Sequence, residues 1–139
     1  LGRISKPLLD RIDIFTETII LKYGEISNSD KGENSYDVRK RIEKVHHIQK
    51  ERYKNDGILF NSELSAGMIK RYCVMDNEAK EYLENIFENM EFSARAYHKV
   101  LKTARTIADM DESGEIKRKH ISEAVCYRTA DKKYWGVTM

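Results

Sequence analysis

The amino-acid sequence predicts a mainly α-helical protein, and two observations carry this prediction. Only one proline and seven glycines occur among 139 residues, so few positions break a helix. Apolar residues make up 40% of the chain and recur mostly at intervals of three and four, the spacing of one helix face. We therefore expect one compact bundle of four to five amphipathic helices joined by short loops.

Residues 1–30 differ in character from the rest of the chain. Ser5–Asp10 suits a short helix with Pro7 in its first turn, and Ile14–Leu21, IFTETIIL, has the β-branched and apolar residues of a strand. No other segment predicts a partner strand. We expect its sheet to lie in a partner or in another part of the same polypeptide, and the segment to be poorly ordered without it. Lys22–Asn34 predicts a flexible linker.

Residues 31–131 predict the main helical domain. A first helix is expected at about Ser35–Lys54. Its buried stripe is expected at Val38, Ile42, Val45, Ile48 and Arg52 or Tyr53. A shorter helix follows at about Ser62–Tyr72, and a third begins at Asp76. The apolar face of the third consists of Ala79, Tyr82, Leu83, Ile86, Phe87 and Met90.

The fourth predicted helix, Phe92–Asp109, is strongly amphipathic, and Ser93 suits its N-cap. One arc of this helix holds the expected core residues Ala94, Tyr97, Val100, Leu101, Ala104, Ile107 and Ala108. The opposite arc is basic and holds Arg95, His98, Lys99, Lys102 and Arg105. A polar turn and a final helix near Arg118–Thr129 follow, and residues 132–139 predict a tail.

Arg95 stands where the helix dipole does not favour a cation. The N-terminus of a helix carries partial positive charge, so an arginine that only faces water there costs roughly 0.3 to 1 kcal/mol. Free amide donors together with a cation suit an anion, most naturally a phosphate. The alternative is an ordinary bundle helix with a solvated basic face.

Two patterns that suggest metal sites are weak. The turn DMDESGEI from Asp109 resembles the start of a calcium-binding EF-hand loop, but position twelve is His120 in place of a bidentate glutamate, and position nine is Lys117. We therefore expect a helix-to-helix turn there. The adjacent His46 and His47 diverge by about 100° on a helix, and we expect both at the surface. No metal site is predicted.

Composition excludes several further classes of protein. No apolar run is long enough to cross a bilayer, and the N-terminus lacks the apolar core of a signal peptide, so we expect a cytoplasmic protein without membrane contact. Cys73 and Cys126 lack CxxC or CxxH neighbours, which favours two reduced thiols packed as small apolar groups. The net charge of +2 divides into acidic and basic helices, and such basic stripes are compatible with nucleic acid.

Two segments carry a resemblance to a known family. They are RISKPLLDRIDI at 3–14 and the helix at 92–109, which is followed by EIKRKHISEAVCYR from Glu115. With SYDVRKRIEKVHHIQKERY and NSELSAGMIKRYCVMDNEAKEYL between them, they closely resemble the C-terminal region of magnesium-chelatase-like AAA+ ATPases of the competence-associated bacterial branch. The resemblance covers nearly the whole chain. It implies that this chain is the end of an ATPase core followed by its helical lid.

The resemblance also implies roles for individual residues. Arg11 in LLDRID is similar to an arginine finger, which reaches the γ-phosphate bound by a neighbouring subunit, and Arg95 in SARAYH is similar to a sensor-2 arginine. Arg3 and Lys99 are weaker candidates. The implied cofactors are ATP and Mg²⁺, held by the rest of the polypeptide, and the implied partners are neighbouring subunits of a ring, expected as a hexamer.

The resemblance leaves the substrate of the parent protein open. No Walker-type GxxxxGK[ST] motif occurs in the sequence, so we expect no ATP hydrolysis by the isolated chain. The motifs LLDRID and SARAYH resemble those of ring motors that act on DNA in branch migration more than those of a true chelatase subunit. A further alternative is a free-standing helical adaptor that binds nucleic acid or an acidic protein through the basic arc Arg95, Lys99, Lys102 and Arg105.

Overall fold

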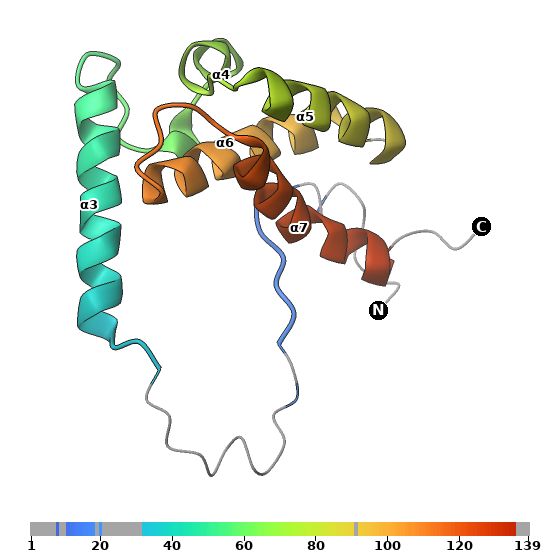
Figure 1. The fold of residues 1–139 in the computed structure, drawn as a ribbon, viewed down its shortest axis with the longest axis horizontal. Coiled ribbons are helices and arrows are strands. Elements are labelled where there is room, and N and C mark those ends of the chain that lie inside the picture. The colour runs from blue at the N-terminus through green and yellow to red at the C-terminus, as the bar shows by residue number, and fades with distance from the viewer. Residues whose placement is uncertain (1–7, 9–10, 19, 21–31, 91, 136–139) are drawn as a thin grey trace.

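A computed structural model describes Leu8 and residues 11–18, 20, 32–90 and 92–135, the stretch 129–135 by its backbone only (Figure 1). The helices in this part are α3 (Ser35–Tyr53), the 3₁₀ turn η1 (Asn61–Glu63), α4 (Ala66–Tyr72), α5 (Asn77–Met90), α6 (Ala94–Met110) and α7 (Arg118–Trp135). They confirm the predicted mainly α-helical bundle. None of them combines the length and the apolar composition that a membrane-crossing helix needs.

Helix α6 lies at the centre of the bundle (Figure 1). It contacts α7, α3, η1 and α4, while α5 packs against α7. Its buried apolar side chains are Ala96, Val100, Leu101, Ala104 and Ala108. The predicted face is therefore right except at its start, where Ala96 is buried and Ala94 is exposed. Because α6 touches most of the other helices, a movement of α6 affects the whole bundle.

Helix α3 is packed only over its C-terminal half. Val45, Gln49 and Tyr53 are buried, whereas Val38 is half-buried and Ile42 is 40% exposed. In Figure 1 the N-terminal half of α3 extends away from the other helices. The predicted stripe is thus wrong in its first half, because a helical period marks an apolar face without showing that another element covers it.

Two helix boundaries differ from the prediction. The segment Ser62–Tyr72 is not one helix, because Leu64 has an extended backbone (φ −54°, ψ 124°) that places its side chain in the core at 2% exposure. Ser65 then caps α4 by accepting a hydrogen bond from the Met68 amide at 3.4 Å. Helix α7 runs to Trp135, so the tail predicted from residue 132 is helical over its first four residues; residues 136–139 lie outside the described part.

The predicted strand Ile14–Leu21 is absent from its described residues, 14–18 and 20. The Phe15 amide instead donates a hydrogen bond to the Tyr127 carbonyl of α7 at 2.9 Å. A β-branched run forms a strand only when another strand supplies its hydrogen bonds. Here the backbone partner of Phe15 is a carbonyl of a helix. Of the predicted helix at 5–10, only Leu8 is described, and it is helical.

The connection between α4 and α5 is tied to the turn between α6 and α7. Ile116 donates to the Val74 carbonyl at 2.8 Å and accepts from the Asp76 amide at 3.2 Å, forming a parallel bridge between Met75 and Ile116. The Asp76 carboxylate also caps α5 by accepting from the Ala79 amide at 2.8 Å. These bonds fix the α6–α7 turn against the connection between α4 and α5.

The two cysteines have different surroundings. Cys73 is buried, and burial raises the pKa of its thiol to about 11, so it stays protonated and unreactive at neutral pH. Cys126 is exposed. The prediction that both pack as small apolar groups is therefore right for Cys73 and wrong for Cys126, which lies on the outer side of α7.

Candidate functional site

Arg95 lies in the first turn of α6 and is exposed. Ser93 caps this turn as predicted, because its hydroxyl accepts a hydrogen bond from the Ala96 amide at 3.1 Å. The turn contains no acidic residue. An exposed cation therefore lies at the positive end of the helix dipole, an arrangement that attracts an anion.

Lys99 lies one turn after Arg95 on the same side of α6. Its ammonium group donates to the Arg11 carbonyl at 2.5 Å and lies 2.8 Å from the Asp13 carboxylate. The Lys99 side chain is only 14% exposed, against 72% for that of Asp13. The structure therefore brings the segment that carries Arg11 to the side of α6 that carries Arg95, and Arg11 itself is exposed.

Arg128 of α7 holds the same segment from the other side. Its guanidinium donates to the Ile12 carbonyl and lies over the Phe15 ring, 5.4 Å from the ring centroid. Arg128 is 2% exposed. Together with the Phe15 amide bond to Tyr127, these contacts attach residues 11–15 to the surface formed by α6 and α7.

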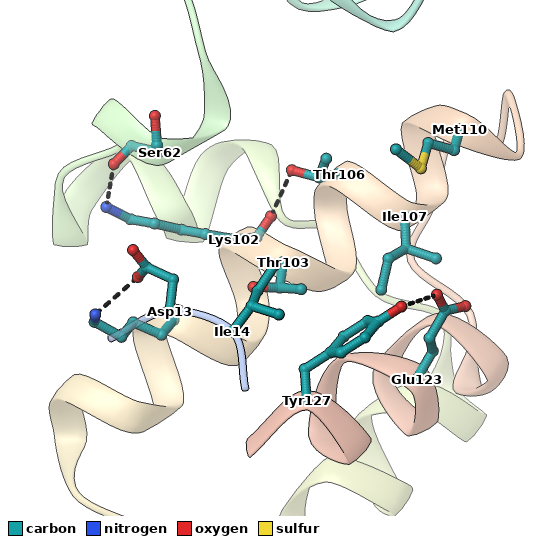
Figure 2. A pocket seen from close by; sticks show the side chains of 11 residues that line it. Asp13, Ile14, Ser62, Lys102, Thr103, Thr106, Ile107, Met110, Glu123 and Tyr127 are labelled. Atoms are coloured by element: carbon teal, nitrogen blue, oxygen red, sulfur yellow. Dashed lines mark hydrogen bonds and ion pairs between the residues drawn. The ribbon is translucent and has the colours of Figure 1, made fainter. Parts of the chain in front are cut away.

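A cavity of about 520 Å³ lies beneath this segment, between α6 and α7 (Figure 2). Asp13 and Ile14 border it on one side. Its other lining residues are Ser62, Lys99, Lys102, Thr103, Thr106, Ile107, Met110, Glu123 and Tyr127. The charged groups at its edge have partners: Asp13 pairs with Lys99, Lys102 donates to the Ser62 carbonyl, and Glu123 accepts from the Tyr127 hydroxyl at 3.1 Å. The cavity therefore offers mainly apolar surface.

The predicted solvated basic face of α6 is wrong at Arg105, which is 1% exposed. Lys99 is also largely covered, and Lys102 donates to the Ser62 carbonyl at 2.8 Å. Of the basic arc assigned to a free-standing adaptor, Arg95 is exposed and these three side chains have partners within the bundle. This pairing weakens the adaptor hypothesis.

Arg105 belongs to a buried polar network centred on Asp109. The Asp109 carboxylate accepts from Arg52 at 2.8 Å, from Asn61 at 2.9 Å and from Arg105 at 3.1 Å. Arg105 also donates to the Gly114 carbonyl at 2.9 Å. Burial lowers the pKa of Arg105, and the charge of Asp109 acts in the opposite direction. The network joins α3, η1, α6 and the α6–α7 turn.

The α6–α7 turn is held by paired charges. Asp111 lies 2.5 Å from the Lys119 ammonium and 3.0 Å from His120 Nε2, and these bonds, that of Lys119 first, hold the pKa of Asp111 below its usual value. His120 Nδ1 accepts from the Lys117 amide at 2.9 Å, so the ring carries its proton on Nε2. The carboxylates of Asp109 and Asp111 thus face cationic side chains, and the segment is the predicted helix-to-helix turn. His46 and His47 are exposed, as predicted.

Two residues of this site were missed by sequence reasoning, although the pattern holds a signal for each. Arg128 follows Ala124 by four residues and Ile121 by seven, which places it on the buried stripe of α7. Asp109 follows Arg105 by four residues, the spacing of a helical ion pair. A charge at a core position indicates a buried partner. Arg3 lies outside the described residues.

Comparison with known proteins identifies relatives along nearly the whole chain. Residues 32–128 match the family described as magnesium chelatase, subunit ChlI C-terminal. The chain is similar to the uncharacterised protein YifB of Salmonella typhimurium, with 38% identity over 133 residues, and to the competence protein ComM of Haemophilus influenzae, with 38% identity over 129 residues. YifB of Escherichia coli is 35% identical over 133 residues.

The relatives are much longer than this chain. The alignments to YifB of Salmonella typhimurium and to ComM cover 95% and 92% of this chain but only 26% and 25% of those proteins. The chain thus spans about a quarter of the length of these curated relatives.

Proposed function

Because this chain belongs to the family of magnesium chelatase subunit ChlI C-terminal domains, we propose that it acts as the helical lid of an AAA+ ATPase. Its relatives YifB and ComM are about four times as long, which leaves room for an ATP-binding core in the parent protein. The chain supplies two arginines, Arg11 from the end of the ATPase core and Arg95 from the lid, to ATP sites whose remaining residues, together with Mg²⁺, lie in the rest of that core. The observation that carries the proposal is the placement of Arg11 and Arg95 beside one side of α6.

Arg95 acts in this proposal as the sensor-2 arginine. It is exposed in the first turn of a capped helix that has no acid in that turn, so an anion is its natural partner. A phosphate bound by the core of the same subunit would attract Arg95 and, with it, the whole of α6. Since α6 contacts most of the bundle, the lid would move as one body.

Arg11 acts in this proposal as the arginine finger. A guanidinium fork placed against a transferring phosphoryl group neutralises the charge that develops there, and its loss typically costs about 10³- to 10⁵-fold in turnover. Arg11 is exposed, and its backbone is held by Lys99, so its side chain is free to extend from the lid surface. We assign it to the ATP bound by the neighbouring subunit of a ring, expected as a hexamer.

The parent protein is proposed to act on DNA, in branch migration. The name of ComM as a competence protein supports this over a chelatase subunit that inserts magnesium into porphyrin. The lid itself is not assigned a DNA contact.

ATP turnover by the full-length parent protein tests both arginines. We expect Arg11→Ala to lower turnover about a thousandfold or more and Arg95→Ala to abolish most of it. Arg39→Ala, which removes an exposed arginine of α3, is the matched control and should leave turnover unchanged. Normal turnover in both Arg11→Ala and Arg95→Ala would remove the proposal.

Mixed rings separate the two roles. A subunit whose own phosphate-binding loop is disabled still offers its Arg11 to a neighbour, so mixing it with Arg11→Ala subunits should restore part of the turnover. The same mixture with Arg95→Ala subunits should stay inactive, because both defects then lie within each subunit's own site. Restoration by neither mixture would show that Arg11 does not act across subunits.

A further inference from the structure

The contacts around residues 11–15 point to a latch, defined as Lys99 and Arg128 together with the backbone atoms they hold. We propose that Lys99 and Arg128 are positioning residues for Arg11, and that they make the direction of Arg11 follow the orientation of α6 and α7. The inference rests on the proposed function of Arg11, and it adds the residues that regulate that function.

The latch holds backbone atoms on both sides of the segment. Lys99 donates to the carbonyl of Arg11, and Arg128 donates to the carbonyl of the next residue, Ile12. The Phe15 amide donates to the Tyr127 carbonyl at 2.9 Å. Successive peptide groups are thereby fixed to two different helices, which determines the path of the chain at Arg11 and leaves its side chain exposed.

Both latch residues are themselves held in place. Arg128 is 2% exposed and lies over the Phe15 ring, and the Lys99 side chain is 14% exposed and paired with Asp13. A covered, charged side chain that bonds a carbonyl is costly to leave without that bond, so it transmits a displacement of its helix to the segment. An exposed lysine would follow such a displacement far less.

The segment is attached by polar contacts more than by packing. Ile12 is 38% exposed and Ile14 is 50% exposed, and the cavity of about 520 Å³ lies beneath Asp13 and Ile14 (Figure 2). The one half-buried apolar side chain of residues 11–15 is that of Phe15, so release of the segment would uncover chiefly this ring. The segment is therefore able to disengage without unfolding the bundle, as a regulated element requires.

The latch connects the two arginines of the proposed site. Arg95 and Lys99 are four residues apart on one side of α6, so a rotation that brings Arg95 to a phosphate also moves Lys99 and, through it, the backbone of Arg11. The nucleotide state of one subunit then sets the position of the finger offered to the next. The bistable element is the segment 11–15, either seated on α6 and α7 or released.

Amide hydrogen exchange of this chain tests the latch without reference to ATP. In Lys99→Ala we expect the Phe15 amide to exchange at least about tenfold faster, while amides in the core of α6 keep their protection. Lys102→Ala is the matched control, because Lys102 also lies on α6 and also donates to a backbone carbonyl, that of Ser62. Equal Phe15 exchange in the two variants would overturn the latch, whatever Arg11 does.

Turnover by the full-length parent protein tests the positioning role. We expect Lys99→Ala to lower kcat roughly ten- to a hundredfold at an unchanged KM for ATP, Lys102→Ala to leave both constants unchanged, and Lys99→Arg to restore kcat because it keeps a charged donor. Unchanged kcat in Lys99→Ala, with turnover lost in Arg11→Ala, would overturn the positioning role. Normal turnover in Arg11→Ala would overturn the proposed finger, and the exchange measurement would then decide the latch alone.

Discussion

Arg95 and Arg105 lie ten residues apart on the same helix and have opposite surroundings. Arg95 is exposed in the first turn of α6, whereas Arg105 is 1% exposed and bonds the Asp109 carboxylate and the carbonyls of Ser113 and Gly114. Arg95 is available to a ligand, whereas Arg105 makes its hydrogen bonds inside the bundle. The difference teaches that a basic residue on an amphipathic helix is a binding candidate only when no buried carboxylate is within its reach.

The largest effect is expected from removing the carboxylate that makes Arg105 structural. Asp109→Ala leaves Arg105 buried without its counterion and Arg52 without a partner from α6, which typically costs about 3 to 5 kcal/mol. Urea unfolding measures the loss, and Glu115→Ala, at an exposed position of the following turn, is the control. A loss below about 1 kcal/mol would mean that the network acts like a surface ion pair.

Direct replacement of the two arginines gives the next largest effect. Arg105→Ala leaves the Ser113 and Gly114 carbonyls without their charged donor, and we expect a loss of about 2 to 3 kcal/mol in the free energy of unfolding. Arg95→Ala should raise that free energy slightly, by about 0.3 to 1 kcal/mol, because a cation leaves the positive end of the helix. Equal losses in the two variants would remove the contrast between them.

Removing the N-cap of α6, Ser93, should have an intermediate effect on the free energy of unfolding. Ser93→Ala removes the hydroxyl that accepts from the Ala96 amide, and we expect a loss of about 1 kcal/mol. Ser93→Asp keeps an acceptor and adds a negative charge at the helix start, so it should retain stability. Because Ser93→Asp also places an anion beside Arg95, a drop in ATP turnover of the parent protein without a loss of stability would support a phosphate at that position.

The smallest effect on stability is expected at Asp111, in the α6–α7 turn whose carbonyls Arg105 also bonds. The pKa of Asp111 is lowered in the folded chain, so its contribution to stability is present above its ordinary value of 3.8 and is lost as the pH falls through the lowered folded value. Asp111→Asn keeps an oxygen for His120 but removes the charge. We expect a slight loss at pH 7 that disappears in acid, measured by urea unfolding at both pH values. A difference that persists below the folded pKa would point to geometry rather than charge.

Much of the bundle was predictable from periodicity. Of the apolar face predicted for α5, Ala79 and Leu83 are buried and the other four residues are half-buried. In α7 the buried residues Ile121, Ala124 and Val125 follow the helical spacing. The caps at Ser93 and Asp76 were predictable for the same kind of reason, since a cap depends on a few adjacent residues. The incomplete burial of Val38 and the exposure of Ile42 were not predictable, because burial depends on whether another element crosses α3 at that point.

The candidate site was predictable only in part. Arg11 and Arg95 were found through their motifs, and both are exposed, but their common placement beside α6 depends on contacts between residues about 88 positions apart. Lys99 was predicted beside Arg95, and the structure shows its ammonium group bound to the backbone of Arg11. Arg128 was missed because its partner carbonyl is 116 residues away.

The sequence by itself determined most of the helices, the N-cap of α6 and the family, because these depend on spacing within single segments. Only the tertiary structure decided which charges are buried and where residues 11–15 lie. It also decided that Phe15, within the predicted strand, bonds helix α7 and not another strand. The physical reason is that burial and long-range hydrogen bonds depend on which surfaces meet. Local periodicity describes each surface but does not identify the surface that covers it.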